Sequence, residues 1–356
     1  MSKVKVTNDL TLTRGKKIVN NSQIIIALLP AFLLIALRSE NIGTDLVRYQ
    51  QGFLNLQYTE FSLAWLFEQL SIREPVFILI NYFTGLVSNW NFQAFIIVTA
   101  LIQFTFVFKS LKKLQSKGYK LTIPFAFFLI FIFIRSFSMV RQSIAMAIVL
   151  YAYTFLEEKN YKKFWIYSII AIGVHYTALI SVLIYFWTKV DKVSVFKRLG
   201  MVIAFLLVLI YGEIILSSVF SMIGAKYANF SFNADFSFGN FLIRLPLLII
   251  IIMYSKAMKE EYLGIDIYLF IFYLDIIVAQ FKYLNVQFER LTMYTFMSLF
   301  FILPVLYKVL RQKFGRRINI VFVTAFIAWF IYNLYFFTNL NPYNLMPYEF
   351  FWQQFN

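Results

Sequence analysis

The placement of the few charged residues constrains the fold of this chain more than any other feature. About ten long runs rich in Phe, Ile and Leu cover most of the chain, close to the length that a membrane-spanning helix needs. Most charged residues lie in short stretches between these runs. Only 14% of the 356 residues are charged, whereas a soluble domain has about 25%. We therefore predict an all-α, polytopic helical membrane protein with about ten to twelve transmembrane helices, including one or two re-entrant or half-span elements.

The apolar runs give the predicted spans. A helix needs about 20 residues to cross the bilayer core, and several runs are shorter than that. The second run is interrupted near residues 88–91, where the sequence reads SNWN. The predicted spans are 22–37, 75–108, 123–140, 142–156, 164–187, 200–220, 240–254, 265–281, 291–307 and 318–337.

Lys and Arg concentrate in alternate loops, which is the positive-inside pattern. This pattern predicts that 1–21, 109–120, 157–163, 189–198 and 308–317 are cytoplasmic, and 255–261 less clearly so. The predicted domains are a basic cytoplasmic N-terminus (1–21), one membrane domain (22–337) with external loops 38–74 and 221–239, and an external C-terminal tail (338–356). Because the net charge of +16 is explained by these loops, no nucleic-acid partner is expected.

Two runs do not fit whole crossings. The stretch from the external loop to the basic loop at 109 must cross an odd number of times, yet it contains two apolar pieces. Run 164–187 lies between two cytoplasmic loops and must cross an even number of times. We predict a re-entrant or half-span element at each place, with His175 near the turn of the second. The alternative is that one loop departs from the positive-inside rule.

The remaining ionisable residues all fall on the external side or in the outer half of a span. An ionisable group at membrane depth is costly, so it marks a functional site by default. These ionisable residues are Arg38, Asp45, Glu74, Arg135, Arg141, His175, Glu213, Arg244, Asp275, Glu289 and Arg290. Cys is absent from the sequence, which excludes thiol nucleophiles and zinc–cysteine sites.

Each of these residues also has a structural interpretation. Arg38 could snorkel at the interface, and Asp45 or Glu74 could cap a helix. Arg135 and Arg141 flank a tight external hairpin, where two guanidinium groups suit a phosphate. A buried ion pair is the alternative there, and also for Arg244 and Asp275, which we expect to face each other. His175 is either a packed hydrogen-bond donor or an acid–base group.

Several short motifs in this order resemble the EpsG-like branch of the Wzy-type polysaccharide polymerases. The first are Arg38–Gly43–Thr44–Asp45–Tyr49 and then Glu74–Pro75–Phe77. They are followed by Arg141–Gln142–Ala145–Ala147–Ile148, His175–Ala178–Leu179 and Glu289–Arg290–Tyr294. The motifs cover residues 38–294, most of the chain.

The resemblance implies a GT-C-like glycosyltransferase of the bacterial cell membrane that needs no cofactor and no metal. Such an enzyme polymerises undecaprenyl-diphosphate-linked oligosaccharide repeat units into capsule, exopolysaccharide or O-antigen at the outer face of the membrane. A flippase and a chain-length regulator are the implied protein partners, beside membrane lipid. The predicted roles are catalytic for Asp45, His175, Glu74 and Glu289, diphosphate-binding for Arg38, Arg135, Arg141, Arg244 and Arg290, and substrate-binding for Tyr49, Gln142 and Tyr294.

Two other functions stay open on the residues alone. A lipid-linked oligosaccharide flippase would also place charges at membrane depth, but nearer the midplane and in two similar halves. A membrane acyltransferase would use a buried His as its base. Outward charges and the lack of an internal repeat favour the polymerase.

Overall fold

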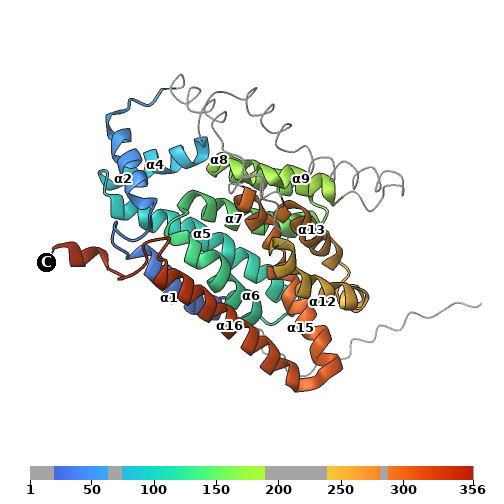
Figure 1. The fold of residues 1–356 in the computed structure, drawn as a ribbon. Coiled ribbons are helices and arrows are strands. Elements are labelled where there is room, and N and C mark those ends of the chain that lie inside the picture. The colour runs from blue at the N-terminus through green and yellow to red at the C-terminus, as the bar shows by residue number, and fades with distance from the viewer. Residues whose placement is uncertain (1–19, 63–73, 189–238, 281–287, 356) are drawn as a thin grey trace, which may run out of the picture.

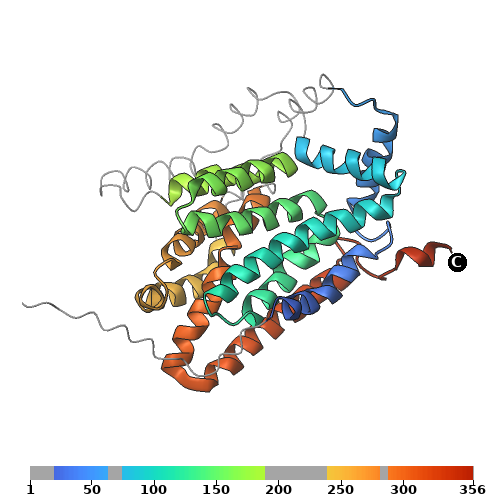
Figure 2. The same ribbon diagram turned by 180° about the vertical axis from the view of Figure 1, so that it is seen from behind.

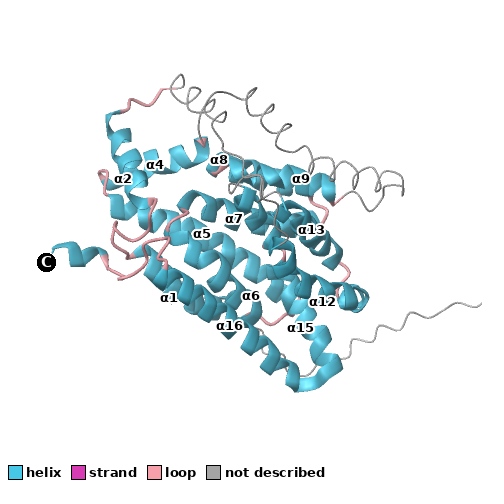
Figure 3. Ribbon diagram, viewed as in Figure 1, coloured by secondary structure: helices cyan, strands magenta, loops and turns pink. Residues whose placement is uncertain are grey.

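The computed structural model describes residues 20–62, 74–188, 239–280 and 288–355, and this part of the chain is helical (Figures 1 and 3). One isolated bridge joins Arg38 and Phe350. The helices in the first half are α1 (Asn21–Ala36), α2 (Leu46–Asn55), η1 (Leu56–Tyr58), α4 (Pro75–Ser88), α5 (Phe92–Ser116), α6 (Thr122–Phe127), η2 (Phe128–Phe133), η3 (Ile134–Phe137), α7 (Val140–Glu157) and α8 (Tyr161–Val174). They are followed by η4 (Tyr176–Leu179), α9 (Ile180–Trp187), α12 (Gly239–Glu261), α13 (Ile265–Val278), α14 (Glu289–Phe296), α15 (Leu299–Phe314), η8 (Gly315–Arg317), α16 (Ile318–Asn339) and η9 (Phe351–Phe355).

Three helical stretches among the described residues are long and apolar enough to cross a membrane. They are Phe92–Ser116, Gly239–Glu261 and Leu299–Phe336, and the last is divided by a turn at Gly315 between α15 and α16. Shorter apolar helices accompany them. The predicted class, an all-helical membrane protein, is confirmed, while the number of spans stays a prediction.

Helix α7 forms the centre of the bundle. It packs against α5 on one side and α8 on the other, and α1 lies along the far side of α5 (Figures 1 and 2). Ala145, Ala147 and Ala152 on α7 are fully buried. Small side chains let neighbouring helices approach closely, which is how helices associate where water gives no hydrophobic drive.

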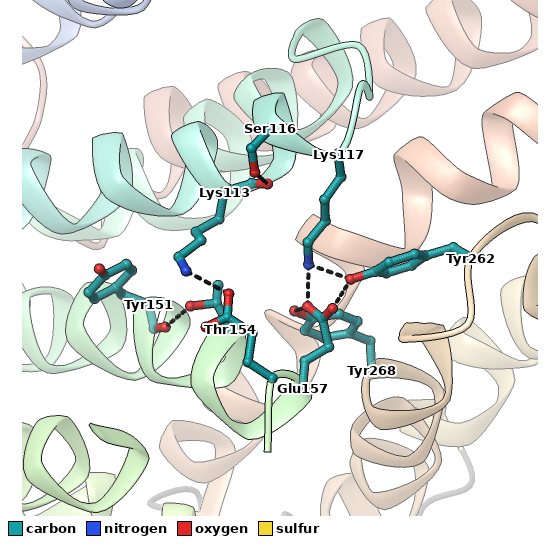
Figure 4. A network of polar contacts seen from close by, with 9 residues as sticks. Lys113, Ser116, Lys117, Tyr151, Thr154, Glu157, Tyr262 and Tyr268 are labelled. Carbon is teal, nitrogen blue, oxygen red and sulfur yellow. Dashed lines mark hydrogen bonds and ion pairs between the residues drawn. The ribbon is translucent and has the colours of Figure 1, made fainter. Parts of the chain in front are cut away.

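Basic loops that are distant in sequence meet at one end of the bundle, which we call the basic end (Figure 4). Lys113 pairs with Glu158 at 2.5 Å, and Lys117 pairs with Glu157. The Glu157 carboxylate also accepts a hydrogen bond from Tyr268 Oη at 2.7 Å and another from the Tyr262 hydroxyl. The loops after α5, α7 and α12, which were predicted to share one side of the membrane, therefore lie together.

The predicted reversal at His175 is present. α8 ends at Val174, His175 is extended (φ −154°, ψ 122°), and α9 begins at Ile180. Tyr185 of α9 packs on Trp165 and Tyr161 near the start of α8, with ring centroids 4.9 and 5.6 Å apart. α9 therefore returns along α8 as a helical hairpin.

A second hairpin forms at the predicted interruption near residues 88–91. Asn89 and Trp90 have positive φ angles and join α4 to α5. Rings at 77 and 95, and at 82 and 90, lie 6.0 Å apart, so the two helices run antiparallel. A Cβ at Gly85 would lie 2.3 Å from the Trp90 ring, so only Gly fits at this position.

Two predicted spans are less regular than expected. Run 123–140 is α-helical only at its start; it continues as the π-helix η2 and the 3₁₀-helix η3 before the chain turns into α7. Run 291–307 is divided into α14 and α15 around 297–298. Thr292 and Thr295 donate to backbone carbonyls of Glu289 and Thr292 in the turn before them, and such back-bonding bends helices. Each of these two predicted spans therefore consists of more than one helical segment.

The opposite end of the bundle, which we call the site end, holds the start of α4, the end of α8 and the loop after α1. The C-terminal segment lies there too (Figure 1). Predictions for Glu213, for loop 189–198, for most of loop 221–239 and for nearly all of the N-terminal region 1–21 concern residues outside those that the structure describes.

Candidate functional site

Glu74 and His175 meet where the start of α4 touches the end of α8. Gly173 of α8 packs directly on Val76 of α4, and a Cβ at position 173 would lie 2.4 Å from Val76 Cγ2. This close approach brings the residue before α4 beside the residue after α8. The Glu74 Oε1 atom is hydrogen-bonded to His175 Nδ1 and accepts a second hydrogen bond from the backbone N–H of Tyr176 at 3.2 Å.

This contact fixes how the imidazole is used. An ionised carboxylate only accepts hydrogen bonds, so Nδ1 must hold the proton and donate it. The lone pair of the neutral ring is then on Nε2, which is the atom able to take a proton from a substrate. Both residues are buried, His175 at 4% and Glu74 at 7% exposure. The sequence offered Glu74 and His175 as separate candidate bases, but the structure joins them into one unit.

Arg141 completes this group from the first turn of α7. Its Nη1 lies 2.5 Å from Glu74 Oε2, and its Nε donates to the Tyr49 hydroxyl at 3.4 Å. The guanidinium also lies over the rings of Tyr49 and Phe77, at 5.3 and 5.7 Å from their centroids. The Arg141 side chain is 42% exposed while that of Glu74 is 8% exposed. Arg141 can therefore contact a ligand while it holds the carboxylate.

The carboxylate of Glu74 is stabilised in its ionised form. Burial alone would raise its pKa, but the hydrogen bond and charge of His175 and the charge of Arg141 lower it, and the net pKa lies below the ordinary value. Burial raises the pKa of Tyr49, with Arg141 opposing that shift. Glu74 is therefore an anion that can orient the imidazole, and its predicted catalytic role stays a prediction.

The predicted caps do not form. Glu74 stands at the N-cap of α4 and Asp45 at the N-cap of α2, yet neither side chain accepts a capping hydrogen bond. Asp45 is positioned by its backbone N–H, which donates to Ser138 Oγ at 3.3 Å, and by the neighbouring Thr44 hydroxyl, 2.6 Å from the same oxygen. The structural interpretation of both carboxylates as caps was wrong.

The short helix α14 connects the predicted residues of the second half to this group. Gln142 Nε2 donates to the Arg290 carbonyl at 3.0 Å, next to Arg141 in sequence. The hydroxyls of Tyr294 and Thr177 lie 3.0 Å apart. Tyr294 therefore contacts the residue that lies two positions after His175 in the sequence. Gln142 therefore holds the α14 backbone, and its predicted contact with substrate stays a prediction.

The expected pair of Arg244 and Asp275 is present. Arg244 Nε lies 2.7 Å from the fully buried Asp275, and Thr295 of α14 donates to the other carboxylate oxygen at 2.7 Å. Arg244 also lines a pocket of about 60 Å³ with Asn240, Ala279, Glu289 and Thr292. Arg244 and Glu289 therefore line the same pocket.

Arg38 and Arg135 are two cations that form no salt bridge with a described residue. Arg38 is 1% exposed, donates to the Ser136 carbonyl at 3.3 Å and lies 5.4 Å from the Phe137 ring. Arg135 donates to the Phe131 carbonyl at 2.7 Å. In the described part of the chain no carboxylate pairs with either residue, and neither Nε has a partner. Arg135 and Arg141 thus have different partners within the protein, and the joint phosphate contact that the hairpin suggested stays a prediction.

Burial lowers the pKa of Arg38 to about 9, with the charges of Tyr348 and Tyr49 opposing the shift. The guanidinium stays charged at neutral pH, so Arg38 is a buried cation without a counter-ion among the described residues. A buried charge of this kind is costly unless a partner binds it. This is the property expected of an anion-binding group.

Some residues of the site were not predicted. The Tyr176 N–H, which donates to Glu74, and the Thr177 hydroxyl, which contacts Tyr294, had a signal in the sequence, because both residues follow the histidine within two positions. For Ser138, which positions Asp45 and Thr44, the only signal in the sequence was its place in the hairpin between Arg135 and Arg141. No three His, Asp or Glu side chains gather as a metal-ligand set within the described ranges.

Comparison with protein families gives a match to the EpsG family over residues 22–350. Comparison with curated proteins and with solved structures gives no significant match. The match covers nearly the whole chain, including every residue of the site described above. The chain belongs to the EpsG family.

Proposed function

We propose that this protein polymerises oligosaccharide repeat units linked to a polyprenyl diphosphate, at the outer face of the bacterial cytoplasmic membrane. Membership of the EpsG family and the apolar helices indicate a membrane protein of polysaccharide biosynthesis. The single observation that supports a transferase is the His175–Glu74 pair beside the exposed Arg141. It unites a base and an anion-binding group within one contact.

In this proposal His175 acts as the general base. Nε2 takes the proton of an acceptor-sugar hydroxyl as its oxygen attacks the anomeric carbon of the lipid-linked glycan. The new C–O bond forms while the bond from that carbon to the diphosphate oxygen breaks. Glu74 stabilises the imidazolium that results and holds the ring in place. The proton stays on Nε2 of His175, and the electron pair of the broken bond stays on the diphosphate oxygen.

The leaving diphosphate gains negative charge as the bond breaks, and a fixed cation close to that oxygen stabilises the transition state. Arg141 is the best-placed group, because its exposed guanidinium lies next to the base. Arg38, Arg135, Arg244 and Arg290 are further proposed contacts to the diphosphate. Asp45 and Glu289 are proposed to bind sugar hydroxyls and not to act as bases, because the His175–Glu74 pair already supplies the base. Tyr49 and Tyr294 line the same region.

The membrane arrangement is part of the proposal. The N-terminus and the basic end would be cytoplasmic, since Lys and Arg follow the positive-inside rule. The site end would then open outward, with α8 and α9 forming a re-entrant hairpin whose tip holds His175 at depth. Ten to twelve helices and a GT-C-like arrangement belong to the same expectation, as do a flippase and a chain-length regulator as partners.

The proposal is tested with membranes that contain the protein and radiolabelled lipid-linked repeat units on their outer leaflet. Ladders of lengthened lipid-linked glycan are expected with the unaltered protein, and only single units with His175→Ala at equal protein abundance. Tyr176→Phe is the matched control, since Tyr176 contacts Glu74 through its backbone alone in the described hydrogen bonds. Relocation of units without lengthening would instead identify a flippase, and acylated product an acyltransferase.

A further inference from the structure

The guanidinium of Arg38 is enclosed at the site end. Arg38 is 1% exposed, its Nε has no hydrogen-bond partner, and no carboxylate within the described ranges pairs with it. Its Nη1 donates to the Ser136 carbonyl at 3.3 Å. A neutral carbonyl offsets only part of the cost of burying a cation, and an anion would offset more of it. The side chain is nevertheless closed off from solvent.

The cover over Arg38 is the C-terminal segment, by which we mean residues 340–353. After α16 the chain continues to the loop that follows α1 and pairs with it there (Figures 1 and 2). Arg38 and Phe350 form an antiparallel bridge. Beside this bridge the N–H of Ser39 donates to the Glu349 carbonyl at 2.9 Å. The C-terminal segment therefore runs directly across Arg38.

The same pairing is supported on both sides of the bridge. The N–H of Phe351 donates to the Leu37 carbonyl at 3.0 Å. Earlier in the C-terminal segment, the Asn344 carbonyl accepts the N–H of Gly43 at 3.3 Å, and Asn344 Nδ2 donates to the Asn41 carbonyl at 2.8 Å. The segment is therefore attached to the loop after α1 at several points, and most of these attachments are main-chain hydrogen bonds.

Tyr348 extends the cover with its side chain. Its hydroxyl donates to the Leu34 carbonyl at 2.5 Å. Its ring meets the Phe137 ring edge to face, with centroids 6.4 Å apart. The Arg38 guanidinium lies 5.4 Å from the centroid of the same Phe137 ring. Arg38 is thus enclosed between the hairpin before α7 and the C-terminal segment.

This cover is a single layer. None of residues 340–353 is buried, and Met346 and Trp352 are 46% and 45% exposed. The residues beneath the layer are buried, with Ser39 at 0% and Ile42 at 2% exposure. A segment with few buried apolar contacts opens at a low free-energy cost. The C-terminal segment can therefore separate from the loop while the helical bundle stays intact.

Beneath the cover, Arg38 is connected to the Arg141 group through the start of α2. Arg38 bonds to η3, and directly after η3 Ser138 Oγ accepts the N–H of Asp45 at 3.3 Å. The Asp45 carbonyl accepts the N–H of Tyr49 at 3.2 Å, and the Tyr49 hydroxyl accepts a hydrogen bond from Arg141 at 3.4 Å. The site end therefore holds one exposed guanidinium and one covered guanidinium on connected elements.

We propose that the C-terminal segment gates Arg38, so that the diphosphate of the lipid-linked substrate reaches this guanidinium only when the segment lifts from the loop after α1. The proposal rests on the proposed function, because it assumes a diphosphate substrate. A ligand that binds Arg38 has affinity for the open position alone, and it therefore shifts the segment toward that position.

A disulfide that locks the C-terminal segment tests the proposal, and the chain has no Cys of its own. Ser39 and Glu349 are paired across the bridge, where Cα atoms lie about 5.5 Å apart, a separation that a disulfide spans. Oxidation of Ser39→Cys/Glu349→Cys should slow the lengthening of labelled repeat units on the order of tenfold or more, because it withholds one fixed cation from the leaving diphosphate. Reductant should restore the rate.

The two single-Cys variants under the same oxidant are the controls, and both should lengthen units at the rate of the unaltered protein. Formation of the disulfide is checked by the mass of the intact protein. An oxidised double variant that lengthens units as fast as its reduced form overturns the proposal.

Hydrogen exchange on the unaltered protein in detergent gives a second test that needs no variant. The amides of Ser39 and Phe351 are hydrogen-bonded while the segment is closed. Both should exchange about tenfold faster with saturating undecaprenyl diphosphate, whereas the Leu37 amide, bonded to Leu33 within α1, should not change. Inorganic diphosphate shows whether the head group alone is enough, and acceleration with either probe supports the proposal. Unchanged or slower exchange with both probes contradicts it.

These results separate gating from the proposed function. If the unaltered protein lengthens units and the locked variant does so equally well, only the gating of Arg38 fails. If His175→Ala still makes full polymer, the proposed function fails, whatever the locked variant does.

Discussion

Glu74 and His175, 101 residues apart in sequence, form one hydrogen-bonded unit in which the carboxylate holds Nδ1 and leaves Nε2 for chemistry. The carboxylate is shared with Arg141, so a base and a cation are positioned by the same group. This arrangement is the reason that we propose His175 as the base among the candidates that the sequence left open. It also means that the three residues should be sensitive to replacement for different reasons.

Replacing His175 with Gln should reduce polymer formation on the order of 10²–10⁴-fold, because the amide cannot accept a proton. Glu74→Gln should reduce it by a smaller factor, since the imidazole remains but loses its orientation. The measurement is kcat/KM for lengthening of labelled repeat units in membranes with matched protein levels. Normal rates for His175→Gln would remove His175 from the chemistry.

Arg141→Ala should leave only single lipid-linked units, with a loss on the order of 10²-fold in rate, because it removes a fixed cation beside the leaving group. Arg141→Lys should recover little, because a point charge cannot reproduce contacts to Glu74, Tyr49 and a phosphate together. Arg48→Ala is the control, as Arg48 is exposed on α2 at the same end of the bundle. Polymer length on a gel, in a deletion strain, is the measurement. Full-length polymer with Arg141→Ala would make this arginine structural.

The pH dependence of stability should reflect Glu74. Its folded pKa lies below its unfolded value, so the ionised carboxylate stabilises the fold above that unfolded value, and the stabilisation is lost as pH falls through the folded pKa. At pH 7, Glu74→Gln should lower the stability by about 1–3 kcal/mol. The difference in Tm from the unaltered protein should shrink as the pH is lowered toward 3. Glu158→Gln, in a partly exposed pair, should change Tm little at any pH; a gap for Glu74→Gln that stays constant with pH would contradict the assignment.

Asp275→Ala should destabilise the protein by about 3–5 kcal/mol, because it leaves the mostly buried Arg244 without its counter-charge. The double variant Arg244→Met with Asp275→Leu should recover protein abundance, since it removes both charges together. It should still fail to make polymer if Arg244 contacts the substrate from its pocket. Abundance in the membrane and polymer length are measured together. Recovery of full polymer by the double variant would assign the pair a purely structural role.

Gly43→Ala and Gly52→Ala form a matched pair on one segment. At Gly43 the backbone is left-handed and a Cβ would overlap the Phe137 carbonyl, so the change should cost about 1–3 kcal/mol and lower the Tm. At Gly52, inside α2, a Cβ meets nothing within 4 Å, and the change should stabilise by about 0.5–1 kcal/mol. Thermal unfolding in detergent measures both. Equal Tm values for the two variants would mean that the loop does not hold this conformation.

The sequence by itself determined the features that depend on solvent and on local backbone chemistry. Because placing polar groups in a bilayer is costly, the apolar runs and the basic loops can be recognised in the sequence. They predict the helical class directly. The interruption near residues 88–91 and the reversal at His175 were predicted because the number of apolar runs between the assigned loops did not match the number of membrane crossings that those loops require. The contact between Arg244 and Asp275 followed from their similar depth and opposite charge.

Tertiary packing alone decided which groups meet around Glu74. Glu74, Arg141 and His175 come from three segments, and nothing local indicates that Gly173 packs on Val76 closely enough to join the first and the last. The same is true of Asn344, which meets Gly43 only because the C-terminal segment pairs with the loop after α1. Such contacts depend on where segments that are distant in sequence lie in space. Helix packing sets these positions, and no short sequence motif indicates them.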